Sequence, residues 1–170
     1  MKEIQRKLLF EMMSNSRRSD RELAKALKTS QPTVTRARRW LEMNGFIAEY
    51  TLMPNFTKIG FELVAYTFFK IHANMTEQSP EHFKKNITAF LNKHPNVVKG
   101  VRGEGMGSDG VLVSYHPNFS DFAKFVRELK ADAVGIEVLG SFLSSLGEEG
   151  ILKKLTFKHF KEYAEKTIKE

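Results

Sequence analysis

The stretch SDRELAKALKTSQPTVTRARRWLEMNGFIAEYTL, residues 19–52, decides the fold of the N-terminal part of this chain. Ser19 and Glu22 have the spacing of a capping box, in which each side chain accepts a hydrogen bond from the other residue's backbone N–H. We therefore predict a helix that begins after Ser19. Its buried side follows at three- and four-residue spacing and consists of Leu23, Ala24 and Leu27.

A second helix is predicted from Gln31 to about Asn44. Thr29 or Ser30 can cap this helix, because either hydroxyl can accept a hydrogen bond from a first-turn amide. Pro32 is tolerated there, since the first amides of a helix have no partner within the helix.

A stop signal and an extended segment follow the second helix. Gly45 provides the left-handed backbone that ends many helices. The pattern beyond it predicts a β-hairpin wing with four apolar residues, Phe46, Ile47, Tyr50 and Leu52. Two capped helices across a tight turn, a glycine stop and a wing, in this order, predict a winged helix-turn-helix, which is a DNA-binding module.

The second helix has two contrasting faces. At about 100° per residue, Val34, Ala37 and Leu41 lie on one side, and basic and hydroxyl residues lie on the other. Such side chains bind base edges and phosphates. We predict that the residues near bases are Gln31, Thr33, Thr35 and Arg36. The predicted phosphate contacts are Arg39, Arg17, Arg18 and Arg21, and Ser30 completes the DNA-binding set. The alternative is a solvated charged face; the surrounding cap, turn, stop and wing favour DNA.

Composition and charge agree with this reading. The chain has 170 residues, 41% of them apolar, and a net charge of +7, which indicates one or two packed domains. Residues 1–53 hold 11 Lys or Arg against 6 Asp or Glu, whereas the rest of the chain holds 16 against 14. The absence of cysteine excludes disulfides and cysteine chemistry. Without a long apolar run or a signal-peptide pattern, we expect a cytoplasmic protein that does not bind membranes.

The chain divides into four predicted segments. A third helix over residues 2–13 completes the first domain, and Pro54, Asn55 and Gly60 then break regular structure and mark a hinge. The predicted segments are a winged helix-turn-helix domain at 1–53, a hinge at 54–60, a second domain at 61–147 and a helical extension at 148–170.

The second domain has the order β-α-β-β-α-β, which predicts a ferredoxin-like α+β fold. The predicted elements are strands at 61–72, 96–102, 111–116 and 134–142, and helices at 80–94 and 118–130. Two helices can cover only one face of a four-stranded sheet. The other face carries apolar side chains such as Val64, Tyr66 and Phe68, so we expect it to pair with the sheet of a second copy, giving a homodimer.

Three stretches resemble the leucine-responsive/AsnC family of prokaryotic transcription regulators, also called feast/famine proteins. The first consists of SDRELAKAL, the helix from Val34 to Leu41 and LEMNGFI; the second is LMPNFTKIGFE and the third is HPNVVKGVRGEGMGSDGVLVSYH. The resemblance spans roughly residues 1–145. It implies a homodimer, often assembled further, that binds operator DNA and in some members senses amino acids near subunit contacts. Arg38 departs from the family, which usually has an apolar residue there. We expect Ala37 to fill the core and Arg38 to reach an acid or a phosphate.

The C-terminal segment extends beyond the resemblance. We predict a helix capped by Thr156, with an apolar stripe of Phe157, Phe160, Ala164 and Ile168. The helix could pack on its own subunit, mediate assembly of subunits, or lie on a membrane surface.

Gly105, Gly107 and Gly110 match the G-x-G-x-x-G nucleotide fingerprint. We reject this match because the fingerprint delivers a phosphate to a helix, and the next segment is predicted to be a strand. The glycines favour positive φ in a hairpin connection. The alternative, which the family resemblance supports, is that Gly105, Gly107 and Asp109 line an effector site for an amino acid or another small molecule.

The sequence predicts no metal site, cofactor or catalytic centre. The five histidines lie in separate predicted elements without metal-ligand spacing, and His116 is expected at a surface or interface. Two alternatives to a regulator stay open. One is an enzyme on the same scaffold, since siroheme decarboxylases look similar to this family. Against it, the sequence shows no clear cluster of histidine and arginine for a polyacidic tetrapyrrole beyond the scattered Arg102, His116 and Arg127. The other is an architectural protein that binds DNA without sequence preference.

Overall fold

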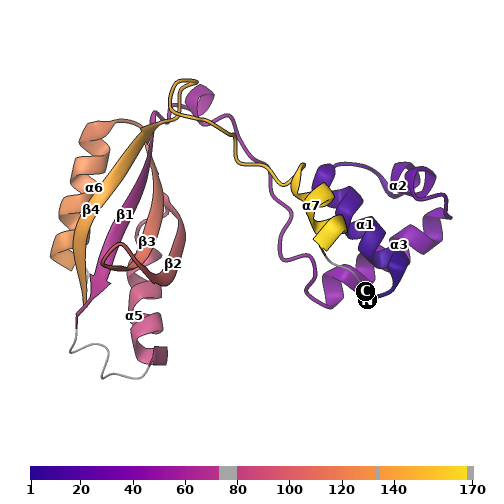
Figure 1. The fold of residues 1–170 in the computed structure, drawn as a ribbon, viewed down its shortest axis with the longest axis horizontal. Helices are drawn as coiled ribbons and strands as arrows, with labels where there is room; N and C mark the ends of the chain where they lie inside the picture. Colours follow the sequence, from indigo (N-terminus) through magenta and orange to yellow (C-terminus); the bar gives the residue numbers. More distant parts are fainter. Residues whose placement is uncertain (73–79, 133–134, 168–170) are drawn as a thin grey trace. The chain divides into compact units, whose positions relative to one another are not determined.

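The chain forms two compact units in a computed structural model that describes residues 1–72, 80–132 and 135–167 (Figure 1). The first, here called the helical unit, contains Met1–Met53 and Lys154–Glu170. The second, here called the sheet unit, contains Pro54–Lys153. Residues at the two ends of the sequence therefore fold together in the helical unit.

The helical unit has a core of apolar residues from three helices. Its elements are α1 (Glu3–Ser14), α2 (Asp20–Ala26), α3 (Gln31–Met43) and α7 (Phe160–Thr167). The core consists of Leu8, Met12, Leu23, Ala24, Val34, Ala37 and Leu41. Leu8, Leu23, Val34 and Leu41 are fully buried, and burial of each such side chain stabilises the fold by about 1.5–3 kcal/mol. The predicted inward face of α3 is confirmed.

The predicted ends of α2 and α3 are confirmed as well. The Ser19 hydroxyl accepts from the Glu22 backbone N–H at 3.3 Å, and the Glu22 carboxylate accepts from the Ser19 N–H at 2.7 Å. The Ser30 hydroxyl caps α3 by accepting from the Thr33 N–H at 3.3 Å. Gly45 follows α3 with a φ of 70°. The start of α2 and both ends of α3 are thus set by local side-chain and backbone chemistry.

The predicted β-wing is wrong in one respect, because no strand is present over residues 46–53, all of which the structure describes. The backbone N–H groups of Phe46 and Ile47 donate to the Leu41 carbonyl at 2.9 and 3.4 Å. The Phe46 ring stacks on Trp40 with centroids 5.2 Å apart. The segment therefore binds back onto α3, and it lacks the cross-strand hydrogen bonds that a hairpin needs.

The C-terminal helix begins later than predicted, at Phe160. The Thr156 hydroxyl accepts from the Lys158 N–H at 3.2 Å in a turn before α7, so it does not cap the helix. Helix α7 packs against α1 in its own chain, and Ala164 is buried there. Phe157 and Phe160 of the predicted apolar stripe are about half exposed or more, so they are not buried with Ala164. Ile168 lies outside the described residues.

The sheet unit has the predicted ferredoxin-like order. Its elements are the short 3-10 helix η1 (Thr57–Ile59), β1 (Leu63–Ile71), α5 (Pro80–Leu91), β2 (Val97–Gly105), β3 (Ser108–His116), α6 (Phe119–Asp132) and β4 (Ile136–Ser145). The antiparallel sheet has the order β2-β3-β1-β4. The core between helices and sheet consists of Phe69, Phe90, Leu112, Phe125, Leu129 and Ile136. Val134, predicted in β4, lies outside the described residues.

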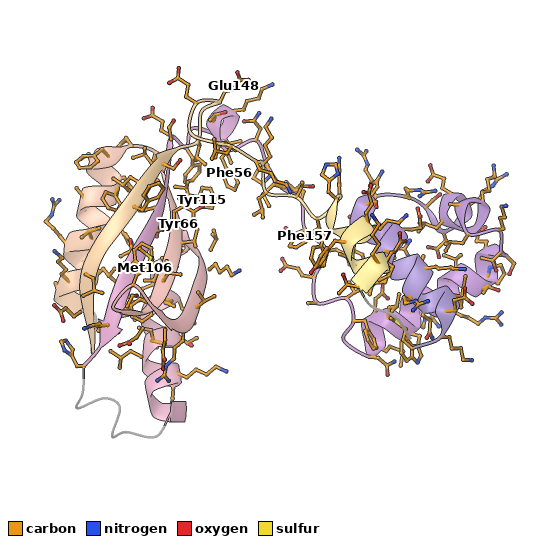
Figure 2. All side chains as sticks on the ribbon, in the orientation of Figure 1. Phe56, Tyr66, Met106, Tyr115, Glu148 and Phe157 are labelled. Carbon is orange, nitrogen blue, oxygen red and sulfur yellow. The ribbon has the colours of Figure 1, made fainter. Side chains whose placement is uncertain are left out.

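The opposite face of the sheet is only partly covered. Tyr66 pairs with Val113 on one neighbouring strand and with Phe142 on the other, and Phe142 is 63% exposed. Near the hinge, the Phe56 ring stacks on Tyr115 with centroids 4.1 Å apart (Figure 2). An apolar surface around Tyr66 and Phe142 therefore faces outward in the single chain.

The glycine-rich connection is shorter than predicted. Strand β2 continues to Gly105 and strand β3 begins at Ser108, and these two residues pair directly with each other. Only Met106 and Gly107 form the turn, with φ values of 54° and 69°. Two successive positive φ values are the requirement of a type I′ hairpin turn. The predicted loop is thus a two-residue turn. The segment after the glycines belongs to a strand, not a helix, so the nucleotide fingerprint is rightly rejected.

Candidate DNA-binding site

The outward face of α3 carries amide, hydroxyl and guanidinium side chains. Gln31, Thr35, Arg36 and Arg39 are all exposed. Among the described residues, the guanidinium groups of Arg36 and Arg39 have no hydrogen-bond or ion-pair partner. The opposite face of the helix is locked into the core by Ala37 and its neighbours. A rigid helix thus holds two free guanidinium forks toward solvent, as base and phosphate recognition requires.

The start of α3 adds hydroxyl groups to this face. The hydroxyls of Ser30 and Thr33 are 2.8 Å apart, while the Ser30 oxygen also caps the helix. Ser30 and Gln31 are exposed, and Thr33 is half-buried. The first-turn amides and the partial positive charge of a helix N-terminus both favour an anion such as a DNA phosphate.

Asp20, the first residue of α2, ties α2 to α3. Its Oδ2 accepts from the Thr35 hydroxyl at 2.6 Å and its Oδ1 accepts from Arg38 Nε at 2.8 Å. Burial acts to lower the pKa of Arg38, but the hydrogen bonds that its guanidinium donates to Tyr50 and Asp20 outweigh burial and raise this pKa. The expectation that Arg38 reaches an acid is confirmed. Sequence reasoning missed Asp20, because no local pattern shows which acid faces α3.

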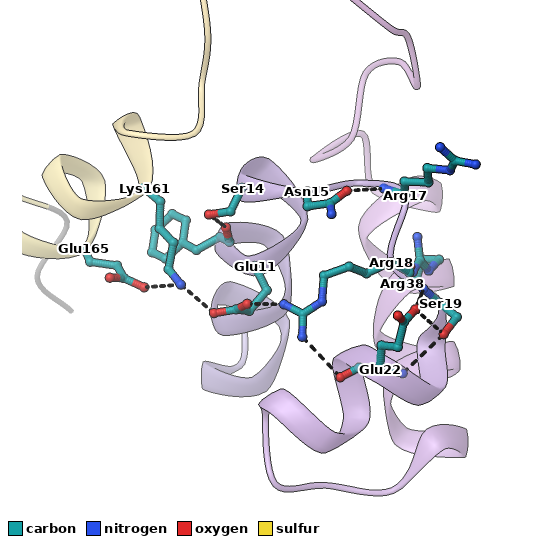
Figure 3. Close-up of polar contacts among 11 residues, drawn as sticks. Glu11, Ser14, Asn15, Arg17, Arg18, Ser19, Glu22, Arg38, Lys161 and Glu165 are labelled. Carbon is teal, nitrogen blue, oxygen red and sulfur yellow. Dashed lines mark hydrogen bonds and ion pairs between the residues drawn. The ribbon is translucent and has the colours of Figure 1, made fainter.

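Arg18 belongs to a second internal network, shown in Figure 3. Its guanidinium donates to Glu11 Oε2 at 2.7 Å and to the Glu22 backbone carbonyl at 3.3 Å. The other Glu11 oxygen accepts from Lys161 of α7. Hydrogen bonds from Lys161 and then from Arg18 lower the pKa of Glu11, although burial opposes this shift. The network joins α1, α2 and α7.

The structure therefore divides the predicted phosphate contacts. Arg17 and Arg21 are exposed, like Arg39. Arg18 is held by Glu11 and would have to leave it to reach a phosphate.

The predicted effector residues lie along the β2–β3 hairpin. Gly105 ends β2, Gly107 lies in the turn and Asp109 lies within β3. Asp109 Oδ2 accepts from the backbone N–H of Ile71 at 2.8 Å and so fixes the end of β1. The three residues are close in the fold, and Asp109 has a structural partner.

The prediction that His116 lies at a surface or interface is wrong, because its side chain is fully buried within its own chain beneath α6. Its Nε2 lies 2.8 Å from the Ser114 hydroxyl and its Nδ1 lies 2.8 Å from Asp121 Oδ2. The rings of Phe122 and Phe125 pack against it. The order Ser–His–Asp is that of a nucleophilic triad, but Ser114 is also fully buried, so a substrate cannot reach it. We interpret this cluster as a structural link between β3 and α6.

No helix among the described residues is both long and apolar enough to cross a membrane. The same residues contain no group of three or more histidine, aspartate or glutamate side chains placed to hold a metal ion.

Comparison with known proteins agrees with the geometry of the helical unit. Residues 1–48 match a family described as winged helix-turn-helix DNA-binding. An uncharacterized HTH-type transcriptional regulator of Pyrococcus furiosus is 28% identical over 133 residues, which cover 78% of this chain and 84% of that protein. A protein of the same description from Pyrococcus abyssi is 28% identical over 125 residues, covering 74% and 79% of the two chains.

Several solved structures resemble this chain over most of its length. An AsnC family transcriptional regulator from Agrobacterium tumefaciens has a TM-score of 0.73 at 21% identity, covering 92% of this chain and 94% of that one. A transcriptional regulator of Neisseria meningitidis in complex with L-Met has a TM-score of 0.71 at 20% identity, covering 94% and 99%. LrpC of Bacillus subtilis has a TM-score of 0.67 at 21% identity, covering 91% and 96%. This chain therefore has the fold of the leucine-responsive/AsnC regulators, with a winged helix-turn-helix segment at its N-terminus.

Proposed function

We propose that this chain is a cytoplasmic, sequence-specific DNA-binding transcription regulator that acts as a homodimer or larger assembly. The observation that carries the proposal is the exposed face of α3, on which Arg36 and Arg39 have no partner among the described residues. Internal ion pairs occupy the neighbouring Arg18 and Arg38. An unpaired guanidinium can bind DNA without first breaking an ion pair.

The proposed contacts follow from position and chemistry. Base contacts come from Gln31, Thr33, Thr35 and Arg36, with Ser30 at the helix start. Phosphate contacts come from Arg39, Arg17 and Arg21. Arg18 stays a predicted phosphate contact that requires release from Glu11.

We propose that two copies pair through the open face of the sheet. Tyr66, Val101 and Phe142 leave an exposed apolar surface there, which a second identical sheet would cover. A symmetric dimer presents two α3 helices to DNA, so the operator should be a rough palindrome. Its half-sites should be about one helical turn, or about 10 bp, apart, or a multiple of this.

An amino acid is the proposed effector class. One oxygen of the Asp109 carboxylate holds the Ile71 N–H, and a carboxylate has further lone pairs that can accept from an ammonium group. The L-Met complex of the Neisseria regulator supports this class by analogy. Addition of each amino acid in a thermal-shift assay tests it, and a shift that Asp109→Ala abolishes is the expected result.

The main experiment is selection of bound fragments from a randomised DNA pool at about 150 mM salt, where specific and non-specific affinities differ clearly. A palindromic motif supports the proposal, with the operator preferred over other DNA by about 10³ or more. Recovery without a motif would instead identify an architectural binder. If no DNA is recovered, an absorbance titration with siroheme tests the enzyme alternative.

A further inference from the structure

The hydroxyl of Thr35 has a fixed direction in the unbound protein. A hydroxyl carries one proton to donate and two lone pairs that accept, whereas a carboxylate can only accept. The Thr35 oxygen lies 2.6 Å from Asp20 Oδ2, so the hydroxyl is the donor in this hydrogen bond. Asp20 is itself held by Arg38 Nε at 2.8 Å. The hydroxyl proton of Thr35 therefore points toward α2.

The second acceptor near Thr35 leads to the same conclusion. The Gln31 backbone carbonyl lies 3.1 Å from the Thr35 oxygen, one turn earlier in α3. Whether the proton goes to Asp20 or to Gln31, it stays within the protein. The side chain is nevertheless exposed, so it offers the solvent only its lone pairs and its methyl group.

We propose that Thr35 reads the operator as a hydrogen-bond acceptor, so that it selects a base carrying an amino group in the major groove. This inference rests on the proposed function. The bases with such a group are adenine, through N6, and cytosine, through N4. Guanine O6 and N7, thymine O4 and the phosphates are all acceptors, and Thr35 has no proton for them. Asp20 is thus a positioning residue that sets the polarity of a base contact without touching DNA.

Replacement of Asp20 by asparagine should reverse this polarity. Arg38 can only donate, so the amide oxygen of the new side chain faces Arg38 and its NH₂ group faces Thr35. The Thr35 oxygen then accepts from the amide. Its proton no longer has the 2.6 Å acceptor of Asp20 and is held only by the longer 3.1 Å contact with the Gln31 carbonyl, from which an acceptor on DNA can draw it. A base with an acceptor, guanine or thymine, should gain preference at the same position.

The test is fragment selection with four proteins: wild type, Thr35→Val, Thr35→Ser and Asp20→Asn. Valine keeps the shape of threonine but has no lone pair, so we expect it to lose the preference for adenine or cytosine at one position of each half-site. The loss should be about twofold to tenfold, the range of one hydrogen bond. Serine is the matched control, which keeps the hydroxyl and should keep the preference. Asp20→Asn should move the preference toward guanine or thymine.

Several results would overturn the inference. One is a wild-type motif that Thr35→Val and Asp20→Asn leave unchanged. Another is an equal loss for all sequences in Thr35→Val, which would indicate a phosphate contact. A third is a loss in Thr35→Ser, which would indicate a methyl contact with thymine. Thermal melting of each variant checks folding, and Thr35→Val alone decides if Asp20→Asn unfolds. A wild type without any motif would instead refute the proposed function.

Discussion

The outward face of α3 and the seam between the helices use the same residue type in opposite ways. Arg36 and Arg39 are exposed on the outward face and have no partner within the described residues. Arg18 and Arg38 lie in the seam, each in an ion pair with a carboxylate and each half-buried. Basic residues that are close in sequence therefore serve two purposes. Paired arginines hold the helices together, and unpaired ones are available to a phosphate or a base.

Two acids create this difference. Asp20 lies at the start of α2 and takes the Arg38 guanidinium, and Glu11 of α1 takes that of Arg18. The Asp20–Arg38 pair joins α2 to α3, and the Glu11–Arg18 pair joins α1 to the loop before α2, so both pairs hold the helices together as well as neutralising charge.

Replacement of Arg36 by alanine should have the largest effect on binding. We expect the affinity for the selected operator to fall about tenfold to a hundredfold and specificity to relax, because one fork to a base is worth about 1–3 kcal/mol. The free energy of unfolding should stay within about 0.5 kcal/mol of wild type, since the side chain touches nothing structural. Fluorescence anisotropy and urea unfolding measure the two quantities. An unchanged affinity would contradict the assignment of α3 to DNA, and Arg36→Lys separates charge from fork geometry.

Replacement of Arg18 by alanine should show the reverse pattern. The guanidinium and Glu11 are 27% and 21% exposed, so their ion pair is partly protected from solvent. We expect the free energy of unfolding to fall by about 1 kcal/mol, between the values of exposed and buried pairs. Urea unfolding measures this, with exposed Arg21→Ala as the matched control. Equal stability of the two variants would remove the distinction between the two arginine groups.

Replacement of Arg39 by alanine should weaken binding to all sequences alike. A phosphate contact carries no sequence information, so operator and scrambled DNA should lose affinity by a similar factor, about threefold to tenfold. The slope of log affinity against log salt should fall by about 0.9. Titrations at several salt concentrations measure the slope. A loss confined to the operator would mean that Arg39 contacts a base, and Arg39→Lys should retain the slope.

The pH dependence of the free energy of unfolding should reflect the ion pairs that Glu11 makes between the helices. Lys161 and Arg18 lower the pKa of Glu11 in the folded protein, so the carboxylate contributes stability above its unfolded pKa of about 4.3. This contribution is lost as the pH falls through the lower folded pKa. We expect less than about 1 kcal/mol, because Glu11 is partly exposed. Urea unfolding of wild type and Glu11→Gln between about pH 3 and 7 measures the difference. If the free energies of unfolding of the two proteins changed in parallel with pH, the Glu11 carboxylate would not be the source of this stability.

Much of the fold was predictable because its signals are local. The caps Ser19 and Ser30, the stop at Gly45 and the inward stripe of α3 are each decided within a few residues. The conformation of the segment after Gly45 was not predictable from its sequence. Phe46 is a residue type that favours strands, but its ring stacks on Trp40 and holds the segment against α3.

Other differences depend on contacts distant in sequence. Lys161 binds Glu11 from 150 positions away, so the packing of α7 on α1 has no local signature. His116 looked exposed because it ends a strand, yet α6 covers it and Asp121 binds it. The alternation that places Ser114 and His116 on one face of β3 was a usable signal for their burial.

The residue types of the site were predictable, but their pairing was not. The sequence shows the arginines between Arg17 and Arg39 as one basic group. Only the fold shows that Arg18 is paired with Glu11 and Arg38 with Asp20, so these two arginines differ from the rest of the group. The direction of the Thr35 hydroxyl likewise follows from a contact 15 residues away.

The most direct measurement compares the wild type with the double variant Arg36→Ala, Arg39→Ala. Both proteins are titrated by fluorescence anisotropy against one selected operator and one scrambled duplex at about 150 mM salt, and their melting is recorded. We expect the wild type to prefer the operator by about 10³ or more, and the double variant to melt as the wild type does but to lose this preference and most of its affinity. A double variant that binds the operator as tightly as the wild type would show that α3 is not the DNA-binding helix.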